Sequence, residues 1–150
     1  MNNTAPSLGW REWVTLPDLG IPYIKAKVDT GARTSALHAF EVEPFQKDGQ
    51  NFVRFSIHPI QGNNVHAVTC EAPVLDIRQV TDSGGHREMR HVIKTTIQAG
   101  DYEWEAEFTL TNRENMKFRM LLGRTAIRTR FLVDSSKSFL IGEKPPSEEQ

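Results

Sequence analysis

Two stretches of the chain alternate apolar and polar residues with a period of two. Over residues 102–110, Tyr, Trp, Ala, Phe and Leu alternate with Glu and Thr, and over residues 52–57, Val53, Phe55 and Ile57 alternate with their neighbours. This period places successive side chains on opposite faces of a β-strand. Strands of this kind build antiparallel sheets with one buried face. The pattern therefore predicts a mainly β fold.

Further strands are expected between clusters of turn-forming residues. The candidates are residues 21–28, 66–77, 89–98 and 131–133, and the turns fall at residues 48–49, 62–64, 83–85 and 99–101. A helix is expected only over residues 124–130, directly after Gly123, with a short turn at residues 34–39. The fold class is thus all-β with one short helix near the C-terminus.

Length and composition favour one domain. The 150 residues, 38% of them hydrophobic, are enough for one core and too few for two ordinary domains. Residues 1–7 are small and polar and are expected to be a disordered N-terminus. Residues 143–150 offer nothing to bury and are expected to form a flexible acidic tail. The domain is therefore expected over residues 8–142.

Charge and hydropathy argue against several functions. Eighteen Lys and Arg face nineteen Asp and Glu, a net charge of -1, so we expect no binding to nucleic acid. Apolar runs are short and residues 1–9 do not form a signal peptide, which predicts a cytoplasmic protein that does not bind membranes. The single cysteine, Cys70, cannot form an intramolecular disulfide.

A short motif carries the candidate chemistry. Asp29, Thr30 and Gly31 follow directly after the apolar residue that ends the strand predicted at residues 21–28. A tight loop can hold a carboxylate with backbone N–H groups, and glycine lets the backbone approach closely. The same three residues are also consistent with an Asx-type turn at the end of a strand.

Two further elements follow the Asp29 motif in the sequence, first a hairpin turn and then an apolar strand that ends in glycine. Residues 120–122 are apolar and lead through Gly123 into the predicted helix. Between this segment and the Asp29 motif, residues 81–86 contain Gly84 and Gly85 and predict a hairpin turn. The order of loop, hairpin and apolar strand ending in glycine is typical of retropepsin-like aspartic proteases.

The resemblance narrows to one bacterial family. Residues 29–38, 92–95, 109–113 and 120–124 resemble the RimB-like family of retropepsin-like aspartic proteases, also labelled ATP-dependent zinc proteases. The resemblance extends from about Gly9 to Ile141 and implies an acid-protease β-barrel. Between Phe52 and Val80 the chain is longer than a viral protease needs, and extra strands are expected there.

The resemblance implies that the active site needs two chains. Aspartic proteolysis uses two carboxyl groups around one water, whereas this chain has one Asp-Thr-Gly. A symmetric homodimer would bring two copies of Asp29 together. In this pattern Asp29 is catalytic, Thr30 holds the two active-site loops against each other, and Gly31 keeps the loop narrow.

The expected substrate is an acidic peptide or protein tail. Members of the family are commonly encoded near ATP-grasp ligases that add glutamates to proteins, which implies a glutamate-rich tail and a functional link to such a ligase. The expected substrate-binding residues are Arg33, Ser35, His38, Gly84, Gly85, Arg90 and Arg124. Arginines could instead pair with acidic residues on solvated strand faces.

The residues predict neither a metal nor another cofactor. The five histidines show no HExxH spacing, and no GxxxxGK[ST] segment is present to hold ATP phosphates. A zinc-dependent peptidase nevertheless remains an alternative. A second alternative is a non-catalytic peptide-binding or regulatory module that partners an ATP-grasp glutamate ligase. A monomer in solution would favour the module.

Overall fold

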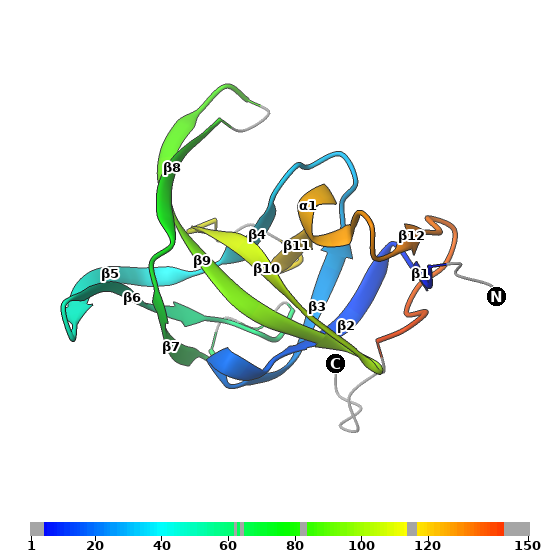
Figure 1. Cartoon of the computed structure of the whole chain (residues 1–150), viewed down its shortest axis with the longest axis horizontal. Coiled ribbons are helices and arrows are strands. Elements are labelled where there is room, and N and C mark those ends of the chain that lie inside the picture. Colours follow the sequence, from blue (N-terminus) through cyan, green and yellow to red (C-terminus); the bar gives the residue numbers. More distant parts are fainter. Residues whose placement is uncertain (1–4, 62, 64, 82–83, 114–116, 143–150) are drawn as a thin grey trace.

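Figure 1 shows a computed structural model that describes residues 5–61, 63, 65–81, 84–113 and 117–142. The strands are β1 (Ser7–Leu8), β2 (Arg11–Leu16), β3 (Ile21–Val28), β4 (Ser35–His38), β5 (Phe40–Lys47), β6 (Gln50–Ile57), β7 (Val68–Pro73), β8 (Asp76–Thr81), β9 (Arg87–Ala99), β10 (Tyr102–Thr111), β11 (Met120–Leu122) and β12 (Leu132–Val133). One short helix, α1 (Arg124–Ile127), follows β11, and a 3-10 turn covers Pro17–Leu19. The predicted all-β class with a short helix near the C-terminus is confirmed.

Six strands close into a barrel. Their order is β10, β4, β11, β3, β2 and β9, and the antiparallel pairing of β9 with β10 completes the ring. Two of the pairings are parallel: β10 with β4, and β11 with β3. Fully buried side chains from these strands fill the interior, among them Ile24, Leu37 and Phe108. The glutamates of the 102–110 alternation lie on the outside, as their period predicts, whereas Thr109 is buried.

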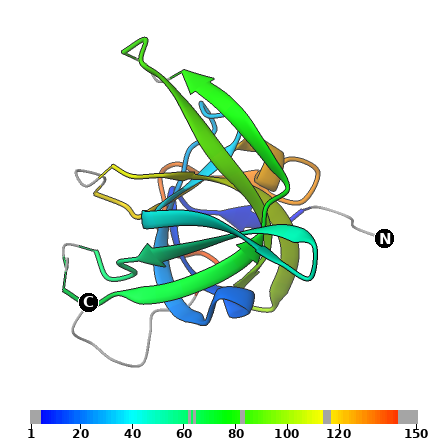
Figure 2. The ribbon, with the colours of Figure 1, turned by 90° about the vertical axis from the view of Figure 1, so that its left-hand side faces the viewer.

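Strands outside the barrel form three additions (Figures 1 and 2). β8 pairs with β9 and continues it into a hairpin that rises away from the barrel. β5, β6 and β7 form a separate antiparallel sheet, seen in front of the barrel in Figure 2. β1 and β12 pair in parallel near the N-terminal end. The expected extra strands are therefore present, and they begin earlier than expected, with β5.

The short turn predicted at residues 34–39 is wrong, because these residues form β4. All four residues of β4 are buried, since the strand lies between β10 and β11 inside the barrel wall. A strand buried on both faces lacks the alternation that marks a half-buried strand. Its sequence therefore carries no signal of period two.

Other predicted boundaries also changed. Residues 66–77 form parts of two strands rather than one, because the chain leaves the β5–β7 sheet after Pro73 and joins β9 at Asp76. Between the two strands, the Leu75 amide donates to the Val92 carbonyl of β9 at 2.8 Å. The helix predicted over residues 124–130 ends at Ile127, and Thr129 has a positive φ of 68°. β5 was not predicted.

The chain ends of the domain are held by a buried carboxylate. Glu12 has no exposed surface, and its carboxylate accepts backbone N–H bonds from Gly9, Leu140, Ile141 and Gly142 at 2.7–3.1 Å. These bonds fix residues 140–142 against β2, while Ser7 already belongs to β1. The remaining predicted tail residues, 1–4 and 143–150, lie outside the described part of the chain. In the described part, no helix has the length and apolar character needed to cross a membrane.

Candidate active site

The Asp29 loop begins where β3 ends. The Asp29 amide donates to the Leu122 carbonyl at 2.8 Å, which fixes the start of the loop on β11. Its Oδ1 atom accepts the Gly31 amide at 3.0 Å, an Asx-type bond within the loop. Asp29 is half-buried, whereas Thr30 and Gly31 are exposed. The loop thus holds a half-buried carboxylate, and the two residues that follow it are exposed to solvent.

β11 and α1 support this loop from behind. Arg124 and Thr125 donate their amides to the carbonyls of Ala32 and Arg33 at 2.9 and 3.0 Å. The Gly123 amide donates to the Ser35 hydroxyl at 3.0 Å. A Cβ atom on Gly123 would lie 2.5 Å from the Thr34 carbonyl oxygen, so only glycine permits this approach. The apolar strand that ends in glycine therefore lies directly against the Asp-Thr-Gly loop.

Arg124 contacts the loop directly. Its Nη1 atom donates to the Thr30 carbonyl at 3.0 Å, across 94 positions of sequence. The guanidinium therefore positions the backbone next to Asp29. This contact gives Arg124 a positioning role in the structure, next to the substrate-binding role expected from the sequence.

Two of the predicted substrate-binding residues lie in the interior. Ser35 and His38 have no exposed surface. The Ser35 hydroxyl accepts the Gly123 amide, and the His38 Nδ1 atom accepts the Arg113 amide at 3.1 Å. The His38 ring also stacks on Phe40. Both side chains therefore support the loops around the site from inside and do not reach its surface.

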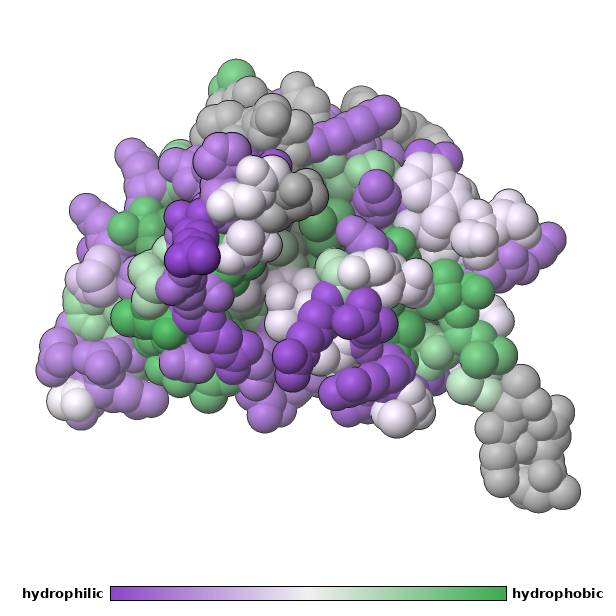
Figure 3. All heavy atoms as spheres, turned by 90° about the horizontal axis from the view of Figure 1, so that it is seen from above, coloured by the Kyte–Doolittle hydropathy of each residue, from purple (hydrophilic) through white to green (hydrophobic). Residues whose placement is uncertain are grey.

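The predicted hairpin around Gly84 and Gly85 is formed by β8 and β9. Their register runs from Asp76 opposite Val92 to Thr81 opposite Arg87, and Gly84 and Gly85 lie exposed at the tip. Residues 82–83 of the tip lie outside the described residues. Figure 1 shows the hairpin rising on the side of the barrel where α1 and the β3–β4 loop lie. Seen from that side, the molecule is mostly hydrophilic (Figure 3).

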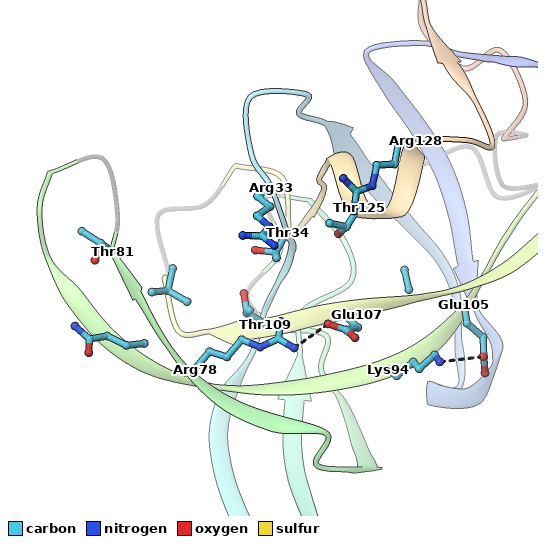
Figure 4. Close-up of a pocket in the computed structure, with 13 residues that line it drawn as sticks. Arg33, Thr34, Arg78, Thr81, Lys94, Glu105, Glu107, Thr109, Thr125 and Arg128 are labelled. Carbon is cyan, nitrogen blue, oxygen red and sulfur yellow. Dashed lines mark ion pairs between the residues drawn. The ribbon is translucent and has the colours of Figure 1, made fainter.

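A cavity of about 750 Å³ lies between this hairpin, β10, the Asp29 loop and α1. Its lining contains four basic and two acidic side chains: Arg33, Arg78, Lys94, Arg128, Glu105 and Glu107. Arg33 and Arg128 enter it from the Asp29 loop and from the segment after α1, as Figure 4 shows. In the described part of the chain, neither of these two guanidinium groups forms an ion pair. The cavity therefore carries positive charge that the described residues leave unneutralised.

The other two cations of this cavity are paired. Arg78 bonds Asp76 at 2.9 Å and Glu107 at 3.1 Å, and Lys94 lies 3.8 Å from Glu105. The hydrogen bonds to Asp76 and Glu107 raise the pKa of Arg78 above its usual value. The hydrogen bond from Arg78 lowers the pKa of Asp76. These pairs attach the base of the hairpin to β10.

Arg90 lies within the hairpin, on β9 opposite Arg78 of β8. Its side chain is buried, donates to Glu88 Oε2 at 3.1 Å and to Thr109 Oγ1 at 3.3 Å, and lines a second cavity of about 250 Å³. Lys27, also in that lining, lies two residues before Asp29 and was not predicted as a site residue. The alternation along β3 could have indicated it, because residues two apart share a strand face.

Asp134 and Cys70 take no part in the site. Asp134 accepts the amide and hydroxyl of Ser136 at 3.0 and 2.6 Å, so its carboxylate stabilises a local turn. Cys70 is buried, and burial raises the pKa of its thiol to about 11. Within the described residues, no group of three or more His, Cys, Asp or Glu side chains could hold a metal ion.

A closed six-stranded barrel, with an Asp-Thr-Gly loop supported by an apolar strand, a glycine and a short helix, defines the retropepsin-like class. The model of the RimB-like family, described as retropepsin-like aspartic endopeptidase RimB, matches residues 7–144. The chain belongs to the RimB-like family.

Similar proteins include longer chains. A protein from Shewanella pealeana named probable alpha-L-glutamate ligase is 49% identical over 144 residues, which are 96% of this chain and 31% of that protein. A protein of the same name from Desulfotalea psychrophila is 43% identical over 91% of this chain and 29% of its own length. The chain therefore spans about a third of these relatives.

One solved structure supports the fold. The crystal structure of Lpg0085 from Legionella pneumophila, titled a protein with unknown function, matches with a TM-score of 0.76 and 27% sequence identity. The match covers 92% of this chain and 98% of that one. The barrel with its added strands is thus shared across nearly the whole of both chains.

Proposed function

We propose that this chain is an aspartic-type endopeptidase that cleaves acidic or glutamate-rich protein tails in the cytoplasm. The observation that carries the proposal is the Asp29 loop. Its carboxylate is fixed by the Gly31 amide, its backbone is held by β11 and Arg124, and Thr30 and Gly31 remain exposed. This is half of a site that needs two carboxylates, and a second copy of the chain supplies the other half.

In the proposed reaction, water lies between the two Asp29 carboxyl groups, which share one proton. One carboxylate takes a proton from the water, whose oxygen attacks the scissile carbonyl, while the protonated partner donates a hydrogen bond to the carbonyl oxygen. The tetrahedral intermediate then collapses, the C–N bond breaks, and a proton passes to the leaving amine. The two carboxyl groups titrate as one unit.

The charge of the larger cavity supports an acidic substrate. Arg33 and Arg128 present guanidinium groups there that form no ion pair with the described residues, and guanidinium groups bind carboxylates with two parallel hydrogen bonds. The relatives named probable alpha-L-glutamate ligase contain a segment similar to this chain. A peptidase acting with an ATP-grasp glutamate ligase would shorten the tails that the ligase extends.

The test compares the wild-type protein with Asp29→Asn on glutamate-rich and neutral peptides from about pH 4 to 8, with products identified by mass spectrometry. We expect cleavage of the acidic peptides by the wild-type protein and none by Asp29→Asn, because an amide cannot accept the proton from water. Asp48→Asn, which changes an exposed aspartate in the β5–β6 turn, is the matched control and should retain activity.

Two other outcomes contradict this mechanism. Cleavage that survives Asp29→Asn and stops on chelation, with recovery on adding zinc, would identify a zinc-dependent peptidase. Binding of a glutamate tail without cleavage by any variant would identify a non-catalytic module for a glutamate ligase. The names of the relatives favour this second candidate over the zinc peptidase.

A further inference from the structure

The smaller cavity is a cluster of cations. Lys27, Arg90, Arg113 and Lys117 line it together with Ala36, Thr111, Phe118 and Leu121, and no acidic residue is found among the described lining. Its volume is about 250 Å³, which is enough for one side chain and too small for a folded partner. The described lining of this cavity is thus basic.

Lys27 links this pocket to the Asp29 loop along the chain. It lies on β3, whose last residue is Val28, and Asp29 follows directly. Leu121 lies opposite Lys27 on β11 and opposite Ala36 on β4, which continues the row across the barrel surface. The pocket therefore lies over the last residues of β3, and the chain continues from there into the Asp29 loop.

One of the four cations, Arg90, already forms an ion pair and hydrogen bonds within the protein. Arg90 is 8% exposed and donates to Glu88 and Thr109, and the Glu88 carboxylate also accepts the Thr111 hydroxyl at 3.2 Å. These bonds anchor Arg90 as a fixed wall between the hairpin and β10. The Arg90 charge is balanced by the Glu88 carboxylate, so the Arg90 side chain forms part of the pocket wall and adds little net positive charge.

The remaining three cations are available to a ligand. Lys27, Arg113 and Lys117 are exposed, and across the described residues none of their side chains forms an ion pair. Phe118 and Leu121 add an apolar wall, with Phe118 itself 9% exposed. A glutamate side chain fits both features, because its methylene groups can contact the apolar wall while its carboxylate meets the ammonium group.

We propose that this pocket is a carboxylate subsite, in which Lys27 selects an acidic side chain next to the scissile bond. The inference rests on the proposed function and adds the residue that determines specificity. Lys27 binds the substrate side chain, Arg113 and Lys117 attract it to the pocket, and Arg90 positions the wall.

The first experiment measures kcat/KM on two tails of equal length, one of glutamate and one of glutamine. The wild-type protein should favour glutamate by at least about tenfold, the value of one charge-assisted hydrogen bond. Lys27→Met should lower kcat/KM for the glutamate tail about tenfold and so remove most of this preference. Lys27→Arg should restore the preference, and Lys47→Met, at an exposed lysine on β5, should keep it.

The second experiment does not depend on turnover. A fluorescent glutamate tail is titrated into the Asp29→Asn protein with and without Lys27→Met. We expect Lys27→Met to raise the Kd about tenfold for the glutamate tail and to leave the glutamine tail unaffected. Because Lys27 is exposed, the substitution should preserve the fold, which the circular dichroism spectrum would verify.

The outcomes separate the two proposals. Cleavage that survives Asp29→Asn would overturn the proposed mechanism, while the binding titration would still decide the role of Lys27. An unchanged preference for glutamate in Lys27→Met, in both cleavage and binding, would overturn the subsite even if the peptidase mechanism held.

Discussion

At the scale of single residues, the candidate site depends on the absence of side chains as much as on their presence. A Cβ atom added to Gly31 would lie 3.3 Å from Asp29 Oδ1. A Cβ atom added to Gly123 would lie 2.5–3.0 Å from backbone atoms of Thr34 and Ala32. Backbone atoms cannot move aside as a flexible side chain can. The position of the Asp29 loop therefore depends on glycine at residue 123.

Gly123→Ala should destabilise the fold by about 3 kcal/mol, because the added methyl group overlaps the Thr34 carbonyl. Urea unfolding of the purified protein measures this change. Gly49→Ala is the control: nothing lies within 4 Å of its Cβ, and its positive φ of 76° should cost about 1 kcal/mol. Equal losses in the two variants would contradict the close approach.

Cys70 should be unreactive in the folded protein. Burial raises the pKa of its thiol to about 11, so very little thiolate is present at about pH 8. A colorimetric disulfide reagent should modify Cys70 rapidly in denaturant and slowly without it. Rapid modification of the native protein would show that β7 opens or that the thiol is accessible.

Residue types alone indicated the Asp29 motif and Gly123, since both combine with neighbouring sequence into a recognisable order. They did not indicate that Ser35 and His38 point into the interior, because residues near a motif in sequence can leave a strand on either face. Residue types did not indicate that Lys27 lines a pocket, because a lysine in a strand is usually a solvated surface residue.

At the scale of elements, the β8–β9 hairpin is attached to the barrel by charge. Arg78 on β8 joins Asp76 on the same strand to Glu107 on β10 at 2.9 and 3.1 Å (Figure 4 shows the pair with Glu107). Exposed pairs of this kind contribute little to stability. They can still orient the hairpin over the larger cavity.

The pairing should appear in the titration of Asp76. The Arg78 hydrogen bond lowers the pKa of this carboxyl below 3.8, so the pair is complete above that pH and is lost as the pH falls through the lowered value. NMR titration of the Asp76 carboxyl carbon should give a midpoint below 3.8, which Arg78→Gln should raise. Asp134, whose pKa is lowered by Ser136, should titrate identically in both proteins. An Asp76 midpoint unaffected by Arg78→Gln would contradict the pairing.

At the scale of the whole molecule, the proposed mechanism makes activity depend on association. One chain supplies one Asp29, so specific activity should fall on dilution as dimers dissociate. An excess of Asp29→Asn protein should suppress the wild-type protein, because mixed dimers carry a single carboxylate. Sedimentation velocity across the same concentrations reports the dimer directly. Specific activity that is constant across a monomeric range would contradict the two-chain site.

Glu12 joins distant parts of the chain, because its carboxylate links β2 to residues 140–142, about 130 positions away. Glu12→Gln should destabilise the protein by about 3 kcal/mol and lower Tm by roughly 6 to 12 °C, because an amide cannot accept all four N–H bonds. Glu103→Gln, at an exposed position on β10, should change Tm little. A small effect of Glu12→Gln in calorimetry would contradict its anchoring role.

The sequence by itself determined the all-β class, the half-buried strands and the order of loop, hairpin and glycine-terminated strand, because these depend on local alternation and turn residues. Only the tertiary structure decided that residues 35–38 form a strand inside the barrel wall, and that Glu12 anchors the other end of the domain. It alone placed Lys27, Arg90 and Lys117 around one pocket. These features arise from contacts between residues distant in sequence, and a local pattern does not encode such contacts.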